Sequence, residues 1–198
     1  MTAIGIAGRG SEVISSPRLR TLIVVILTAG AISLTAWVVN GGPDDGLTAI
    51  NITAGPGSRP VAGEPPPGFA AQTVDGKPFT LGDFAGKPIW LTFGASWCAD
   101  CRAEAADLQA TYATFGDQGL VVVGVFIQEN DAAVREYAAR VGLTYTMTAD
   151  PSARIAAAYH TLGIPTHFFI GRDGLIREVR LGALERADME RLVRQLLD

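Results

Sequence analysis

IWLTFGASWCADC, at residues 89–101, joins a run of apolar side chains to two cysteines that stand three positions apart. The apolar run Ile89–Phe93 is typical of a buried strand, and Ala99–Phe115 has helical periodicity. Cys98 is therefore expected at a helix N-terminus, where unpaired N–H groups and the helix dipole favour a thiolate. Cys101 follows one turn later, so it can form a disulfide with Cys98 or release a mixed disulfide.

The chain of 198 residues holds no other cysteine. A disulfide scaffold usually spreads several pairs along the chain, and one close pair closes almost no loop. The pair therefore indicates chemistry more than structural cross-linking. A C-x-x-C motif between a strand and a helix is typical of thiol redox proteins.

The residues around the cysteines argue against three other uses of the pair. Haem attachment requires a histidine after the second cysteine, where Arg102 stands. A structural zinc site needs two more ligands, for which only His160 and His167 are available. Pro88 and Thr92 have the spacing of a peroxiredoxin-type Pro-x-x-x-Thr-x-x-Cys run, but alanine occupies the position of its cysteine. We expect no resident metal and no cofactor beyond a redox-active disulfide.

Strand and helix patterns alternate from Phe69 to the C-terminus. They indicate an α/β domain with a central mixed sheet and helices on both faces. We expect an N-terminal β-hairpin and an extra strand–helix unit between Cys101 and Pro165. The expected elements are a hairpin at 72–81, strands at 89–93, 120–127, 145–148, 166–170 and 175–181, and helices at 99–115, 131–141, 150–159 and 185–197.

Local signals set the helix starts and faces. Asp131 is expected to cap one helix, and Asp150-Pro151-Ser152 to open another, with proline in its first turn. The first long helix is expected to bury an apolar face, consisting of Ala103, Ala106, Leu108, Tyr112 and Phe115.

Residues 21–39 (TLIVVILTAGAISLTAWVV) carry no charge. As a helix they would span about 28 Å, close to the hydrocarbon thickness of a bilayer. Arg9, Arg18 and Arg20 precede the run, so the positive-inside rule predicts a cytoplasmic tail at 1–20 and export of the rest. We expect a signal-anchor at 21–39, a Gly/Pro-rich linker at 40–68 and the globular domain at 69–198.

A cleaved signal peptide is the alternative. Ala29-Gly30-Ala31 fits a small-x-small cleavage site, although the apolar run continues beyond it. Both interpretations place the globular domain outside the cytoplasm. The formal net charge of −4 gives no basic face for nucleic acid.

Together the motifs resemble the extracytoplasmic thioredoxin-like proteins of the TlpA/ResA type. The resemblance covers roughly residues 60–198 and rests on residues 89–98, Cys101-Arg102-Ala103-Glu104, Gly163-Ile164-Pro165-Thr166 and Phe168-Phe169-Ile170. It implies a thioredoxin-like fold and thiol–disulfide exchange with protein substrates. It also implies roles such as preparing apocytochrome c thiols for haem attachment, with a membrane thiol donor restoring the dithiol.

The resemblance assigns roles to individual residues. Cys98 matches the attacking cysteine, Cys101 the resolving one, and Pro165 a cis-proline beside the disulfide. Trp97, Ile164 and Pro165 would then contact substrate, with the Ile164 backbone free to pair with an extended segment. Glu104 matches an acid that tunes the thiols or accepts a proton. Its alternative is an ordinary surface glutamate.

Two positions depart from relatives. Thr92 stands where thioredoxin has a buried aspartate, which directs attention to Glu104. Asp100 stands where many relatives have proline before the second cysteine. A carboxylate there would disfavour the Cys98 thiolate and make the protein a better reductant. Alternatively, Asp100 only serves the helix N-terminus.

Overall fold

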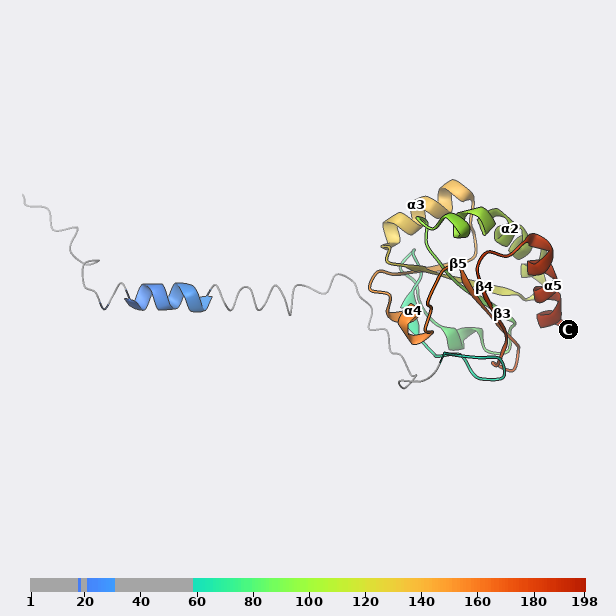
Figure 1. Cartoon of the computed structure of the whole chain (residues 1–198), viewed down its shortest axis with the longest axis horizontal. Coiled ribbons are helices and arrows are strands. Elements are labelled where there is room, and N and C mark those ends of the chain that lie inside the picture. Colours follow the sequence, from blue (N-terminus) through green and yellow to red (C-terminus); the bar gives the residue numbers. More distant parts are fainter. Residues whose placement is uncertain (1–17, 19–20, 31–58) are drawn as a thin grey trace, which may run out of the picture. The chain divides into compact units, whose positions relative to one another are not determined.

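A computed structural model of the chain describes residue 18, residues 21–30 and residues 59–198 (Figure 1). Residues 21–30 are helical, and the rest of the expected anchor, 31–39, lies outside the described residues. Within the described parts of the chain, no helix has both the length and the apolar character needed to cross a bilayer.

The domain is built on a five-stranded mixed sheet in the order β5-β4-β3-β6-β7. Strands β3 (Ile89–Gly94), β4 (Val121–Ile127) and β5 (Thr146–Asp150) run parallel. Strands β6 (Thr166–Ile170) and β7 (Ile176–Leu181) complete the sheet through antiparallel pairs. A separate antiparallel hairpin, β1 (Ala70–Gln72) with β2 (Pro78–Thr80), confirms the expected N-terminal hairpin.

Helices cover both faces of this sheet, as expected. One face packs against α2 (Ala99–Phe115), α3 (Asp131–Val141) and α5 (Arg186–Leu197). The other packs against α4 (Arg154–Ala158), the hairpin and the 3-10 helix η1 (Leu81–Phe84). A second 3-10 helix, η2 (Gly116–Gln118), follows α2. In Figure 1 the strands β3, β4 and β5 run between α2 and α3 on one side and α4 on the other.

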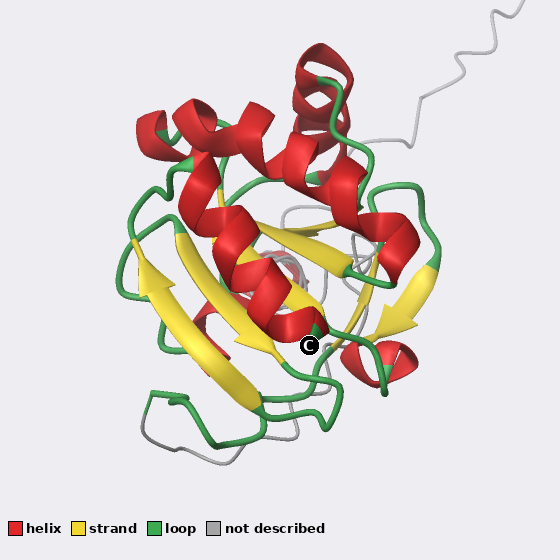
Figure 2. Ribbon diagram, turned by 90° about the vertical axis from the view of Figure 1, so that its right-hand side faces the viewer, coloured by secondary structure: helices red, strands yellow, loops and turns green. Residues whose placement is uncertain are grey.

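Alternating side chains along each strand build the two cores. Trp90, Val122 and Phe169 belong to the core under α2, α3 and α5. Their neighbours Leu91 and Phe168 belong to the opposite core. Figure 2 shows α5, which carries the C-terminus, lying across the strands of the sheet.

Two expected helix starts are wrong. Asn130, not Asp131, caps α3, because its side chain accepts the N–H of Ala133 at 3.0 Å. Helix α4 begins at Arg154, not at Asp150-Pro151-Ser152. Asp150 instead ends β5, paired with Ile127, and its buried carboxylate accepts the N–H groups of Arg154 and Ala156.

The end of the expected linker lies against the domain. Gly63 N–H donates to the carbonyl of Ile176 at 2.8 Å, and Ile176 N–H donates to the carbonyl of Glu64 at 2.9 Å. The Tyr159 hydroxyl donates to the carbonyl of Pro67 at 2.7 Å. These bonds fix the chain ahead of Phe69 to β7 and to the end of α4.

Candidate active site

The two cysteines form a disulfide at the N-terminus of α2, with their Cα atoms 5.3 Å apart. Cys98 is the N-cap residue, and its Sγ accepts the N–H of Cys101 at 3.2 Å. The expected placement of Cys98 at a helix N-terminus is confirmed. This position supplies donors to a developing thiolate, which is the nucleophilic form of cysteine.

A second segment faces the disulfide from the start of β6. The Ile164–Pro165 peptide bond is cis, and the Ile164 carbonyl oxygen lies 3.8 Å from Cys98 Sγ. Pro165 is buried, whereas Ile164 is half-buried. Trp97, next to Cys98, is 53% exposed, and Leu162 is 86% exposed. The fold thus brings Ile164 to Cys98, with two large exposed apolar side chains on the flanking segments.

Glu104 is buried, with 4% of its surface exposed, so the surface interpretation is wrong. It lies on the buried face of α2 that also carries Cys101. Its Oε2 accepts the N–H of Leu184 at 2.9 Å and lies 3.5 Å from Nε2 of His167. An acid held in this way close to the disulfide has the surroundings of a functional group.

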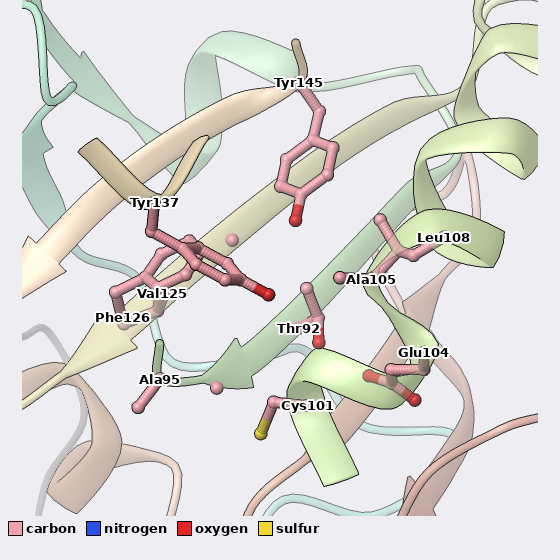
Figure 3. A pocket seen from close by; sticks show the side chains of 12 residues that line it. Thr92, Ala95, Cys101, Glu104, Ala105, Leu108, Val125, Phe126, Tyr137 and Tyr145 are labelled. Atoms are coloured by element: carbon pink, nitrogen blue, oxygen red, sulfur yellow. The ribbon is translucent and has the colours of Figure 1, made fainter. Parts of the chain in front are cut away.

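A small cavity of about 30 Å³ lies behind Cys101 (Figure 3). Cys101, Glu104, Tyr137 and Tyr145 line it, with Thr92 and apolar side chains. A cavity of this size can hold a water molecule, for which Glu104, Tyr137 and Tyr145 offer hydrogen-bonding groups. Burial raises the pKa of Tyr145, and the neighbouring Tyr137 and Glu104 raise it further, so its hydroxyl stays protonated.

Thr92 belongs to a core polar cluster, defined here as Trp90, Thr92, Glu104 and His167. Thr92 Oγ1 lies 3.0 Å from Nδ1 of His167, and Trp90 Nε1–H donates to the same nitrogen at 3.3 Å. His167 Nε2 lies 3.5 Å from Oε2 of Glu104, which links the carboxylate to the other members of the cluster. Among the described residues, no group of three or more His, Cys, Asp or Glu side chains is arranged to hold a metal ion.

Asp100 is exposed in the first turn of α2. Glu129, which the motifs did not indicate, is buried beside the active-site loop. Its carboxylate accepts both the N–H of Ser96, at 2.7 Å, and the Ser96 hydroxyl. Arg102 donates to the carbonyl of the same serine at 3.1 Å. The loop before Cys98 is therefore held by one carboxylate and one guanidinium.

The fold and the disulfide define the protein as a thioredoxin-like thiol–disulfide oxidoreductase. The chain belongs to the AhpC/TSA family, whose model matches residues 62–179. Its relatives place it with the TlpA/ResA-type members.

Two curated relatives carry the name thiol-disulfide oxidoreductase ResA. The one from Geobacillus kaustophilus is 28% identical over 173 residues, which cover 87% of this chain and 91% of the relative. The one from Bacillus subtilis is 29% identical over 122 residues, which cover 62% and 68%.

The solved structures agree in fold. A thiol:disulfide interchange protein of the thioredoxin family from Chlorobium tepidum is 31% identical with a TM-score of 0.63, covering 72% of this chain and 99% of that one. A secreted Mycobacterium tuberculosis disulfide oxidoreductase, described as homologous to DsbE of E. coli, is 27% identical with a TM-score of 0.60. That match covers 65% of this chain and 96% of the relative.

Proposed function

We propose that the protein is a membrane-tethered, extracytoplasmic reductase of protein disulfides. The observation that carries the proposal is the position of Cys98, which caps α2 and faces the backbone of Ile164. Cys101 lies one turn further in, against the cavity. This arrangement supports attack by Cys98 and resolution by Cys101, and the Cys98–Cys101 disulfide is proposed as the redox group.

The reaction has two displacement steps. The Cys98 thiolate attacks one sulfur of a substrate disulfide, forms a mixed disulfide and releases the other substrate sulfur as a thiolate. Cys101 then loses its proton and attacks Cys98 Sγ. The bond between Cys98 and the substrate breaks, the second substrate thiolate leaves, and the Cys98–Cys101 disulfide forms. The substrate gains two electrons, and the protein loses them.

Glu104 is proposed as the group that takes the Cys101 proton during resolution. It lines the same cavity as Cys101, and a water in that cavity could carry the proton between them. The buried position of the carboxylate supports this role, because an exposed acid would exchange protons with solvent instead.

The substrate is proposed to dock across Trp97, Ile164 and Pro165. An extended peptide can pair with exposed backbone while its side chains contact neighbouring apolar groups. The exposed rings and methyl groups of Trp97 and Leu162 fit that use. Leu162, which the sequence motifs did not indicate, is included because of its exposure.

The reducing direction is proposed from Asp100, whose carboxylate would disfavour the Cys98 thiolate and so favour the disulfide form. Apocytochrome c disulfides, whose reduction prepares the thiols for haem attachment, are one substrate class consistent with the resemblance, and a membrane thiol protein would return electrons to the pair. Residues 21–39 are proposed to hold the protein in the bilayer, supported by their uncharged sequence and the arginines ahead of them. Membrane fractionation and the mass of the mature chain test anchoring against cleavage.

Trapping in cells tests the function. The C101S variant should accumulate mixed disulfides through Cys98, which mass spectrometry can identify, while the matched C98S variant should accumulate none. An empty C101S trap would contradict the proposal. Two assays on the purified wild type distinguish other functions: rapid peroxide consumption would indicate a thiol peroxidase, and tight stoichiometric zinc or copper uptake would indicate a metal chaperone.

A further inference from the structure

His167 is a fully buried imidazole that the two displacement steps leave without a role. It lies on β6, two residues after Pro165, and faces β3 and α2. Its ring touches Trp90 edge-on, with centroids 5.8 Å apart. A buried imidazole needs partners for both of its nitrogens, so its contacts restrict which nitrogen carries the proton.

The contacts of Nδ1 fix the tautomer. Trp90 Nε1–H can only donate, and it donates to Nδ1 at 3.3 Å. Nδ1 must therefore be the unprotonated, accepting nitrogen. The Thr92 hydroxyl, 3.0 Å away, can donate to the same atom. A proton on Nδ1 would oppose the indole N–H, so the tautomer that fits these contacts carries its proton on Nε2.

The Nε2–H group points to Glu104. Nε2 lies 3.5 Å from Oε2 of Glu104, and among the described residues this buried nitrogen has no formed hydrogen bond. The same Oε2 accepts the N–H of Leu184 at 2.9 Å. Among the described residues both contacts fall on one carboxylate oxygen. Glu104 also lines the cavity with Cys101, and Oε1 carries neither of these two contacts.

We propose that His167 is a positioning residue for the resolving step. Its Nε2–H faces Oε2 of Glu104 at 3.5 Å and needs only a small shift to bond to it, which leaves Oε1 for the cavity behind Cys101. The proposal deepens the proposed function, because it rests on Glu104 as the acceptor of the Cys101 proton. In that step the proton passes from Cys101 Sγ to Oε1, the Cys101–Cys98 bond forms, and the substrate leaves as a thiolate. Glu104 then returns the proton to solvent or to the departing thiolate.

Other groups also face the Glu104 carboxylate. Tyr137 from α3 and Tyr145 from the segment before β5 line the cavity with it, and burial raises the pKa of both hydroxyls. Arg102 and Glu129 act on Tyr137 from the rim of the site. A pH profile must therefore be compared between variants that leave these groups unchanged.

Two substitutions separate the functions of the two nitrogens. In H167N the amide can replace Nδ1 and meet Trp90 and Thr92, but it is too short to reach Glu104. In H167Q the longer amide can place an N–H group near the position of Nε2. H160N is the matched control, since His160, the only other histidine, is exposed.

The experiment measures both half-reactions by stopped flow across a pH series, using a peptide disulfide with a chromophoric leaving thiol. We expect H167N to slow the resolving step by about ten- to a hundredfold and to alter its pH profile, with the first attack by Cys98 unchanged. H167Q should recover much of the rate, and H160N should match wild type.

Several results would overturn the proposal. Equal resolving rates in H167N and wild type would do so, provided that E104Q slows resolution. If E104Q also matches wild type, the proton role of Glu104 fails first. If wild type does not reduce the peptide disulfide, the proposed function fails instead. Nitrogen NMR of the wild-type imidazoles needs no variant to fold: a proton on Nδ1 of His167 would refute the positioning argument.

Discussion

Glu129 holds Ser96 by two bonds, one to its N–H and one to its hydroxyl, two residues ahead of Cys98. The two residues come from different loops, one after β4 and one after β3. A buried carboxylate that accepts two hydrogen bonds is costly to remove, because the loop donors then lose their partner. The conformation of the loop before Cys98 is thus fixed by Glu129, which lies 31 positions after that cysteine in the sequence.

Replacement of Glu129 by alanine tests this anchor. We expect E129A to lower the free energy of unfolding by about 1–3 kcal/mol. It should also slow the first attack by Cys98, because the loop carrying it loses its fixed geometry. S96A is the matched control, since it removes the hydroxyl bond and keeps the N–H bond. Urea unfolding and single-turnover kinetics give both quantities, and an E129A protein indistinguishable from S96A would contradict the anchor.

Gly124 tests the packing around the cavity. A Cβ atom at this position would lie 2.9 Å from Cε2 of Tyr145 and 3.2 Å from Cε2 of Phe126. We expect G124A to destabilise the fold by about 1–3 kcal/mol, because the buried rings must move. In G94A the new Cβ would meet Cys101 Sγ at an ordinary 3.5 Å, so this variant is the control. Equal unfolding midpoints for the two variants would show that the rings adapt freely.

Because two tyrosines are buried, we expect the folded protein to lose stability at alkaline pH. Burial raises the pKa of Tyr145 and Tyr159 above the ordinary value of 10.0. A tyrosine whose pKa is raised by folding contributes its full stabilisation at pH values below its pKa in the unfolded chain. This stabilisation is lost as the pH rises towards its pKa in the folded protein. The free energy of unfolding should therefore fall above pH 10, by up to about 1.4 kcal/mol per pH unit for each group.

Phenylalanine variants isolate this effect. The Y145F/Y159F double variant should show a shallower alkaline fall in urea unfolding, followed together with tyrosinate absorbance. At neutral pH, Y159F alone should cost about 1 kcal/mol, since its hydroxyl donates to the carbonyl of Pro67. An unchanged alkaline slope in the double variant would refute the assignment.

Asp100 can act through its charge on the Cys98 thiolate or by stabilising the N-terminus of α2, and substitutions distinguish these two roles. If its charge disfavours the Cys98 thiolate, D100N should raise the reduction potential by up to about 30 mV, the value of a tenfold change in the equilibrium. D100P should shift it in the same direction. Equilibration with glutathione buffers measures the potential. A potential that stays at the wild-type value, with lower stability in both redox forms, would favour the helix N-terminus alone.

The sequence predicts most of the sheet and helices because their signals are local. The apolar run at Ile89, the helical period after Cys98 and the turn before β7 each act over a few residues. The start of α4 is different, since Asp150 carries a capping signal but is drawn into β5 by its pairing with Ile127. Pairing between strands, which a local pattern does not contain, decides that boundary.

The buried face of α2 is a second case in which a local sequence pattern is insufficient, here at the active site. Ala103 and Ala106 were expected inside but are exposed, whereas Leu108 and Phe115 are buried as expected. Glu104 takes an inner position because Leu184, 80 residues later, supplies a donor. Apolar periodicity ranks alanine above glutamate, so the local pattern does not place Glu104 inside, although the family resemblance indicates it as an acid of the site. Glu129 has no local signal, and its role depends on the distant Ser96.

The clasp formed by Gly63, Glu64 and Ile176 has a mechanical consequence. Force applied to the chain ahead of residue 63 enters the domain at the start of β7, through the two bonds to Ile176. The load reaches an edge strand of the main sheet before it reaches the small hairpin at Ala70. Stretching experiments should therefore show an early rupture of this clasp, with Cys98 and its supporting loop still in place.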